Sequence, residues 1–360
     1  MASFKILTLD NPDLWRSVLS VDRSVFGSVE FARIASKTTN AEARLLIFSD
    51  DHCQVAYPFF LRHVDDLPFA RQINGHLGDI QSPEYCGPLL LKGRLQEDPS
   101  AFIRTFHDYC LAEGIVAEFA RLHPWRTAEA LLDSSRVFLN REIVYIDLSH
   151  SLEDIWTTSL NHQCRVSIRK ARRSGVSIIE GKDKTSVIDF HRIYMDTMRR
   201  HQAAEKYRFP LSYFESFQTE LPLNSRFVLA KFQGCVVAGS LYLSDEEDLY
   251  AYLGGLDVKY QELRPRNALT YEMIKWGKAN GKKRLILGGG YRSEDGVFRH
   301  KASFSPLRAN FCVYKQVHIP EAYARLCNQN HVSEVAENEG TEFFPAYRIS
   351  EESPGSTKAF

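Results

Sequence analysis

Residues 288–304 read GGGYRSEDGVFRHKASF, in which three glycines precede a cluster of basic residues and a closing phenylalanine. Glycine lets a backbone pass close to a substrate, although three glycines could equally form a turn or a bulge. The cation of Lys301 is suited to the negative charge that develops when an amine attacks an ester. We therefore take Lys301 as the candidate catalytic residue, with a solvated surface lysine as the alternative.

The same stretch offers further chemistry. Tyr291 could stack on a nucleotide of a substrate, although a surface tyrosine after a turn is equally ordinary. No residue stands out as a general base. Because an ester is already activated, positioning of the two reactants could supply much of the acceleration.

A second stretch, residues 161–175, carries five Lys or Arg residues and no acid. Arg165, Arg169 and Arg172 recur at helical spacing and so share a face, with Lys170 and Arg173 beside them. Arginine pairs with phosphate through two parallel hydrogen bonds. The pattern favours a surface that binds a nucleotide diphosphate, a lipid diphosphate or an RNA backbone. A basic face paired with acids elsewhere in the fold is the alternative.

A third basic group precedes a helix predicted over 267–280. Arg264 and Arg266 flank Pro265, and both Pro265 and Asn267 suit a helix start. Because a helix N-terminus carries partial positive charge, the two arginines there predict an anion site. A cap without a ligand is the alternative.

The elements that position these residues follow from sequence patterns. The segment 151–176 is predicted as one basic helix, which starts at Ser151 and stops at Gly175. Its buried stripe would be formed by the four apolar residues at four-residue intervals, Trp156, Leu160, Cys164 and Ile168.

The chain also contains an internal sequence repeat. RLLIFSDDHCQVAYPFFL (44–61) aligns without gaps with RFVLAKFQGCVVAGSLYL (226–243). Each copy is an apolar run, a short turn and a second apolar run, which is typical of an antiparallel hairpin. Later in each half, a helix ends at a glycine, Gly114 or Gly281, before a strand. We predict a duplicated α/β (α+β) domain, each copy with a mixed, largely antiparallel sheet flanked by helices.

We place the two domains at 1–150 and 151–330, followed by a polar, acidic tail over 331–360. The strand IVYIDLS (143–149) is interpreted as closing the first domain. Phe343, Phe344 and Tyr347 of the tail could dock on the body of the protein.

Composition narrows the function classes. Lys+Arg and Asp+Glu both number 45, so affinity for a polyanion must come from a local patch. The seven cysteines are scattered without C-x-x-C spacing, which argues against a zinc ribbon and a disulfide scaffold. The start MASFKILTLDNPDLW is unlike a signal peptide, and no apolar run approaches about 18 residues, so we expect a cytoplasmic protein. Because H-E-x-x-H, G-x-S-x-G, P-loop and G-x-G-x-x-G motifs are absent, we expect neither a metal nor a cofactor.

Three segments resemble the FemAB-like group within the GNAT superfamily: residues 145–176, the helix FHRIYMDTMRRH (190–201) and LGGGYRSEDGVFRHKASFSP (287–306). The resemblance implies two tandem GNAT-like halves, in agreement with the internal repeat. It also implies transfer of an acyl group to an amine. The best-known FemAB-like proteins take an amino acid from aminoacyl-tRNA to build peptidoglycan cross-bridges.

The group's C-terminal signature, Phe-Lys-x-x-Phe, falls on Lys301 and Phe304, with His300 where the group usually has Phe. By this resemblance Lys301 lies at the reacting end of the donor and Phe304 contacts substrate. Arg200, on the 190–201 helix, is the counterpart of a similar arginine and would contact substrate as well.

GNAT proteins that use acyl-CoA carry the loop Q/R-x-x-G-x-G/A, whose backbone N–H groups hold the pyrophosphate. The matching segment here, residues 260–276, contains no glycine before the helix and offers Arg264, Arg266 and Asn267 instead. This argues against tight binding of CoA by the usual route and is compatible with the acceptor end of aminoacyl-tRNA.

We therefore expect an acyltransferase that moves an amino acid from aminoacyl-tRNA to an amine of a cell-wall precursor or a natural-product intermediate. The alternatives are an acyl-CoA-dependent N-acyltransferase and a non-catalytic binder of RNA or anionic lipid. The transferred group, the acceptor and the oligomeric state do not follow from the sequence.

Overall fold

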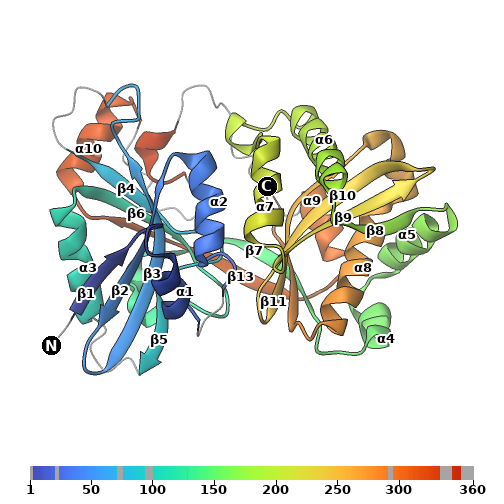
Figure 1. Ribbon diagram of the computed structural model, residues 1–360, viewed down its shortest axis with the longest axis horizontal. Coiled ribbons are helices and arrows are strands. Elements are labelled where there is room, and N and C mark those ends of the chain that lie inside the picture. Colours follow the sequence, from blue (N-terminus) through green and yellow to red (C-terminus); the bar gives the residue numbers. More distant parts are fainter. Residues whose placement is uncertain are drawn as a thin grey trace. The chain divides into compact units, whose positions relative to one another are not determined.

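The computed structural model describes residues 3–20, 24–70, 76–93, 100–127, 129–290, 295–332 and 343–349 (Figure 1). They form two compact units. The first comprises the residues up to Arg141 and those from Asn310 on, and the second comprises Glu142–Ala309. The described residues from Asn310 on, which the sequence pattern places in the second domain and the tail, belong to the first unit.

The first unit is a mixed sheet with helices against it. Its strands are β1 (Ser3–Leu7), β2 (Glu42–Ser49), β3 (Cys53–His63), β4 (Gly78–Gln81), β5 (Leu89–Gly93), β6 (Ile115–Arg121) and β13 (Arg308–Val317). Its helices are α1 (Pro12–Val18), α2 (Val29–Thr39), α3 (Ser100–Ala112) and α10 (Pro320–Gln329), with 3₁₀ turns η1 (Glu129–Leu131), η2 (Ser134–Arg136) and η7 (Ala346–Arg348).

The second unit repeats this plan. Its strands are β7 (Val137–Asp147, of which the later residues belong here), β8 (Ser177–Gly181), β9 (Ser225–Phe232), β10 (Cys235–Ser244), β11 (Asp248–Leu256) and β12 (Arg284–Gly288). Its helical elements are α4 (Leu152–Asp154), the π turn η3 (Ile155–Ser159), α5 (His162–Arg173), α6 (Lys184–Arg200), η4 (Glu205–Tyr207), α7 (Leu211–Glu220), η5 (Val258–Leu263), α8 (Pro265–Ala279) and α9 (Gly296–Ala302).

The order of strands confirms the duplication. Neighbouring strands follow β1-β2-β3-β4-β6-β13 in the first unit, where β5 also pairs with β3, and β8-β9-β10-β11-β12-β7 in the second. Each order contains an antiparallel hairpin that is formed by one copy of the internal repeat, β2–β3 or β9–β10. Each also contains one parallel pair, β4–β6 or β11–β12, before which a helix ends at a glycine with positive φ, Gly114 or Gly281. The predicted fold class, two tandem domains with largely antiparallel sheets and flanking helices, is confirmed.

The strand IVYIDLS (143–149), which is predicted to close the first domain, lies in the second unit. Residues 144–147 of β7 pair antiparallel with β12 in the second unit. In the first unit the place beside β6 is taken by β13, which pairs with it from Val313 to Val317. The pattern of IVYIDLS predicted a buried strand correctly, but its partner lies far along the chain and leaves no local signal.

The sheet of the second unit is apolar on both faces. Val228 and Ala230 of β9 belong to a core with Ile168 of α5 and Met273 of α8. On the opposite face, the ring of Phe227 packs edge-on against Phe190 of α6 at 5.2 Å between centroids. Alternate residues of β9 are therefore covered by different helices, which holds α5 and α8 on one face and α6 on the other.

The basic segment forms a broken helix rather than a continuous one. Ser151 caps its start as predicted, accepting a hydrogen bond from the Asp154 N–H, and Gly175 ends it with φ of 84°. Between them the chain leaves helical geometry at Leu160, and Asn161 caps a second helix, α5, by accepting a bond from the Cys164 N–H. The break arises because an N-cap residue lies inside the predicted helix.

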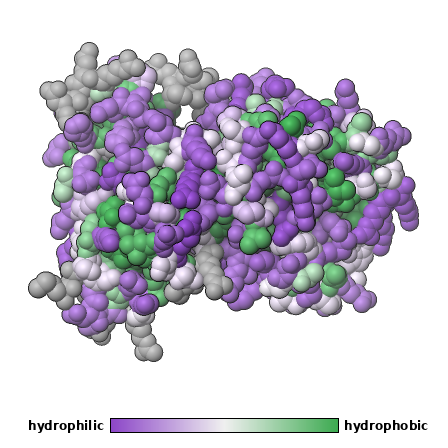
Figure 2. Space-filling model, viewed as in Figure 1, coloured by the Kyte–Doolittle hydropathy of each residue, from purple (hydrophilic) through white to green (hydrophobic). Residues whose placement is uncertain are grey.

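The predicted docking of the tail is confirmed for Phe344 and Tyr347, which are buried in the first unit, whereas Phe343 is 41% exposed. The Tyr347 hydroxyl donates to the buried carboxylate of Asp79 at 2.9 Å. Among the helices that the structure describes, none has the length and apolar character to span a bilayer. The face in Figure 2 is largely hydrophilic, with small apolar patches.

Candidate functional site

Two parallel strands of the second unit part at their carboxyl ends. Pairing of β11 with β12 ends at Tyr250 and Ile286, although β11 continues to Leu256. The helices that follow these strands, α8 and α9, begin beyond this point. Ligands of α/β sheets bind beyond the carboxyl ends of parallel strands, so the residues on α8 and α9 are candidates for a site.

Lys301 lies on the short helix α9, next to the glycine stretch. The side chain of Asp295 caps α9 by accepting from the Phe298 N–H at 2.7 Å, and Lys301 Nζ donates to the Gly289 carbonyl at 2.7 Å. Gly288 has φ of 76° at a bulge of β12, and a Cβ on Gly290 would come within 2.5 Å of the Asp295 carboxylate. The glycines therefore shape the turn that holds the Lys301 ammonium.

The N-terminus of α8 carries the two arginines in an unusual backbone. Arg264 is the N-cap residue and has φ of 57° and ψ of 38°, the left-handed region that favours glycine. Pro265 opens the helix, two residues before the predicted start at Asn267. Asn267 is buried, and its amide Nδ2 lies 3.8 Å from Cys164 Sγ of α5. A carbonyl in the same region, Ser303 O, accepts from the Asn161 N–H, so α5, α8 and α9 meet here.

His300 marks the centre of the cluster. Burial and, in decreasing order, the charges of Arg266, Lys301 and Arg264 together lower the pKa of its imidazole to about 3. His300 is therefore neutral at physiological pH. Because a base with so low a pKa is weak, this imidazole is suited to hydrogen bonding rather than to accepting the proton of an amine.

Sequence reasoning missed a neighbour of this cluster. Tyr242 on β10 is buried, burial raises its pKa, and hydrogen bonds with Thr270 and Ser240 and the charge of Arg266 oppose the rise. In the sequence it stands in an alternating apolar strand and reads as a core residue. Its approach to α8 depends on the tertiary fold.

The arginines of α5 differ in their surroundings. Arg165 Nη1 donates to the carbonyls of Trp156 and Thr157 at 3.2 and 3.1 Å and also to that of Leu160. Arg165 therefore binds the end of the preceding turn, where carbonyls have lost their helical partners.

Arg169 and Arg172 are exposed and lie against aromatic rings. The Arg169 guanidinium is 5.2 Å from the Trp156 ring, and that of Arg172 is 5.2 Å from the Tyr271 ring. Stacking of this kind leaves the edge of a guanidinium open to a phosphate. Within the described part of the chain, no acid forms an ion pair with Arg169, Arg172 or Arg173.

Lys170 connects this face with α8. Its ammonium lies 3.5 Å from Glu262, and Glu262 lies 3.6 Å from Arg264. All three side chains are substantially exposed, so these ion pairs contribute little to stability. Lys170 and Arg169 also line a surface hollow of about 480 Å³ with Val166, Arg173 and Ser174.

Three further residues were predicted to contact substrate. Arg200, at the end of α6, donates to the Leu256 carbonyl at 2.9 Å. Phe304 is 1% exposed in the core and packs edge-on against His300, with 5.5 Å between the ring centroids. Tyr291 lies outside the described residues. The structure thus brings together Arg264, Arg266, Asn267 and Lys301.

Comparison with known proteins shows which families this chain resembles. A family model described as an acetyltransferase (GNAT) domain matches residues 159–301, which lie within the second unit. Residues 159–301 are therefore similar to a GNAT acetyltransferase domain, which supports the expected acyltransferase. No curated protein matches the chain in sequence.

Solved structures extend the likeness to both units. FemX has a TM-score of 0.67 and 12% identity, with 90% of this chain and 99% of FemX covered. A conserved protein of unknown function from Bacteroides thetaiotaomicron has a TM-score of 0.58 and 13% identity, covering 88% of this chain and 100% of that one. The C-terminal domain of an Agrobacterium fabrum protein named as a lysylphosphatidylglycerol synthetase has a TM-score of 0.53 and 13% identity, covering 88% and 96%. The expected acyltransferase with a FemAB-like fold is confirmed.

Proposed function

We propose that this acyltransferase forms an amide, moving an amino acid from aminoacyl-tRNA to an amine of a cell-wall precursor or a natural-product intermediate. One observation carries the proposal. Arg264, Arg266 and Lys301 surround a neutral His300 where the helix N-terminus of α8 adds its own partial positive charge. Such a cluster suits a donor that brings both phosphate and a reacting ester.

Each residue has a role in this proposal. Arg264 and Arg266 would bind the phosphate nearest the reacting end of the donor. Lys301 would stabilise the oxyanion as the ester is attacked, from the orientation that its bond to the Gly289 carbonyl fixes. Arg169 and Lys170 would bind phosphates further along the RNA, and Asn267 and Arg165 would hold the elements in place. Arg200 and Tyr291 keep their proposed contacts with the acceptor or its nucleotide.

A second candidate, an acyl-CoA-dependent N-acyltransferase, is favoured by the backbone of Arg264. Its left-handed conformation is the one that glycine adopts readily in a phosphate-binding loop. An arginine can therefore replace the glycine without loss of the turn, and the N–H groups of α8 would remain available to a pyrophosphate.

The donor can be tested directly. The protein is incubated with charged total tRNA, a mixture of amines and separate acyl-CoAs, and new amides are detected by mass spectrometry. We expect product from the tRNA mixture and its loss after RNase treatment. Activity that survives RNase and requires an acyl-CoA would establish the second candidate instead.

Lys301→Met tests the role of the ammonium. By comparison with loss of an oxyanion donor, we expect the turnover rate to fall about 10²–10³-fold, with KM changed far less. Lys182→Met is the matched control, because Lys182 belongs to the same unit and its side chain is 78% exposed. An equal loss in the control, or none in Lys301→Met, would contradict the assignment.

A further inference from the structure

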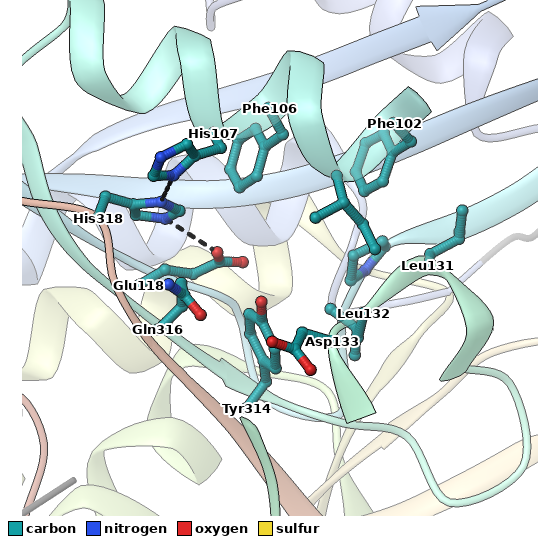
Figure 3. Close-up of a pocket in the computed structure, with 12 residues that line it drawn as sticks. Phe102, Phe106, His107, Glu118, Leu131, Leu132, Asp133, Tyr314, Gln316 and His318 are labelled. Carbon is teal, nitrogen blue, oxygen red and sulfur yellow. Dashed lines mark hydrogen bonds and ion pairs between the residues drawn. The ribbon is translucent and has the colours of Figure 1, made fainter. Parts of the chain in front are cut away.

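The first unit contains a cavity of about 260 Å³ that the proposed transfer does not use (Figure 3). It lies between α3 on one side and β6 and β13 on the other. Ligand pockets for drug-sized molecules have volumes of about 300–1,000 Å³. This cavity therefore suits a smaller occupant.

One wall of the cavity is apolar. Phe102 and Phe106 of α3 stack with 5.9 Å between ring centroids and an interplanar angle of 3°. Ile103, Leu131 and Leu132 extend this wall. An apolar or aromatic group placed here would be removed from water on contact with these side chains.

The opposite wall presents hydrogen-bond acceptors. Glu118 of β6 is 2% exposed and lines the cavity, as does Gln316 of β13. The Gln316 amide donates to the Val317 carbonyl, which directs its amide Oε1 away from that bond. In Figure 3 these side chains and Tyr314 lie across the cavity from the rings of α3.

A chain of hydrogen bonds fixes the Glu118 carboxylate. The buried Tyr57 hydroxyl donates to Glu118 Oε1 at 2.8 Å, and His318 Nε2 lies 3.2 Å from Oε2. His318 Nδ1 in turn lies 2.9 Å from Nδ1 of His107. A carboxylate oxygen can accept two hydrogen bonds, so each oxygen of Glu118 has capacity for one more.

The charges around the cavity are predominantly negative. Its lining includes the carboxylates of Glu118 and Asp133 and no Lys or Arg. Burial and the nearby His318 lower the pKa of His107, which keeps that ring neutral. Arg136 acts on the Tyr314 hydroxyl from outside the lining.

We propose that this cavity binds a small organic ammonium compound, with its N–H groups on Glu118 and Gln316 and its apolar body against Phe102 and Phe106. An ammonium supplies the donors that the free acceptor positions lack and compensates a buried carboxylate, which is costly to leave without a cation. A metal ion fits less well, since no group of three or more His, Cys, Asp or Glu in the described residues could hold one.

Calorimetry on the intact protein with three probes of one shape tests the charge of the occupant. Phenethylamine is the cation, 2-phenylethanol its neutral analogue and 3-phenylpropanoate its anionic analogue. We expect phenethylamine to bind at least about tenfold more tightly than either analogue, because one charged hydrogen bond contributes about 1.5–3 kcal/mol. Equal affinity for the alcohol, or no binding of the amine, would overturn the proposal.

Glu118→Gln keeps the shape of the side chain and removes its charge. We expect it to weaken the binding of phenethylamine at least about tenfold, while Glu321→Gln, the same change on an exposed glutamate of α10, leaves binding intact. Unchanged affinity in folded Glu118→Gln protein would contradict the proposal.

If Glu118→Gln does not fold, Ile103→Trp serves as the test variant instead. A larger side chain at this half-buried position fills the cavity and leaves Glu118 unchanged. Loss of binding supports the site, and retained binding overturns it. Lys301→Met must leave binding unchanged, which separates this site from the proposed transfer.

Discussion

The imidazole of His300 shares its surroundings with Arg264, Arg266 and Lys301, and burial and these charges lower its pKa to about 3. A histidine of the unfolded chain has a pKa of about 6.5. Between these two values the unfolded state binds a proton that the folded state does not. The free energy of unfolding therefore falls as the pH is lowered through this window.

His300→Phe removes this titration and introduces the residue that is usual in the FemAB-like motif. We expect the wild type to lose about 1–2 kcal/mol more stability than the variant between about pH 7 and pH 5, after allowance for solvent at a half-buried site. Urea unfolding at several pH values measures the difference. His52→Phe, a change at an exposed histidine of the first unit, should follow the wild type. Parallel curves for wild type and His300→Phe would show that His300 protonates freely in the folded state.

At the scale of elements, the N-terminus of α8 combines a strained backbone with a functional cluster. A non-glycine residue in the left-handed region costs about 1–2 kcal/mol. Arg264 adopts this conformation with φ of 57°, and its exposed ion pair with Glu262 offsets little of the cost. Strain retained in this way is common where a side chain is needed for function.

Arg264→Gly relieves the strain and removes a charge from the site. The relief of backbone strain exceeds the entropy cost of glycine, which is about 0.5–1 kcal/mol. We therefore expect the free energy of unfolding to stay constant or rise by up to about 1 kcal/mol. Transfer activity should fall because the charge is lost. Gln233→Gly is the matched control, because Gln233 has φ of 50° in the β9–β10 turn and lies outside the cluster. It should gain stability and keep its activity. A marked loss of stability in Arg264→Gly alone would mean that the side chain holds the fold together.

What the sequence could predict at this scale was local. The two hairpins, the glycine stops and the start of α8 at Pro265 follow from alternation, turn residues and caps, which act within a few residues. The sequence predicts one continuous helix over 151–176, and the break before α5 arises because Asn161, inside that span, acts as an N-cap.

The grouping of the site was only partly predictable. Resemblance pointed to Lys301, and helix-start chemistry pointed to Arg264 and Arg266. Their convergence on His300, the burial of Phe304 and the approach of Tyr242 depend on packing between distant segments. The cavity beside Glu118 left no motif, since its lining comes from α3, β6 and β13.

At the scale of the whole molecule, the two units differ in continuity. Among the described residues, those of the second unit all lie between Glu142 and Ala309, whereas the first unit needs β13 and the following α10, which come after the second. Tyr314 of β13 belongs to the first unit's core, and Tyr323 and Tyr347 belong to another of its buried clusters.

This arrangement predicts the behaviour of fragments. We expect residues 142–309 to unfold cooperatively as an isolated fragment, because β7 still pairs with β12 there and the core is complete. Residues 1–141 should lack a cooperative transition, since β6 loses its partner and the core loses Tyr314. Thermal melts followed by near-UV circular dichroism compare the two. A cooperative melt of 1–141 would show that β13 is dispensable.

The late position of β13 also sets an order of events during synthesis. A chain emerging from the ribosome normally folds its first domain first. Here the strand that pairs with β6 follows the whole second unit, so the unit that is made first is completed last. Until β13 emerges, β6 presents an unpaired edge of the kind that other chains can join. The growing chain therefore passes through a period in which protection of that edge, by a chaperone or by rapid completion of the chain, decides its yield.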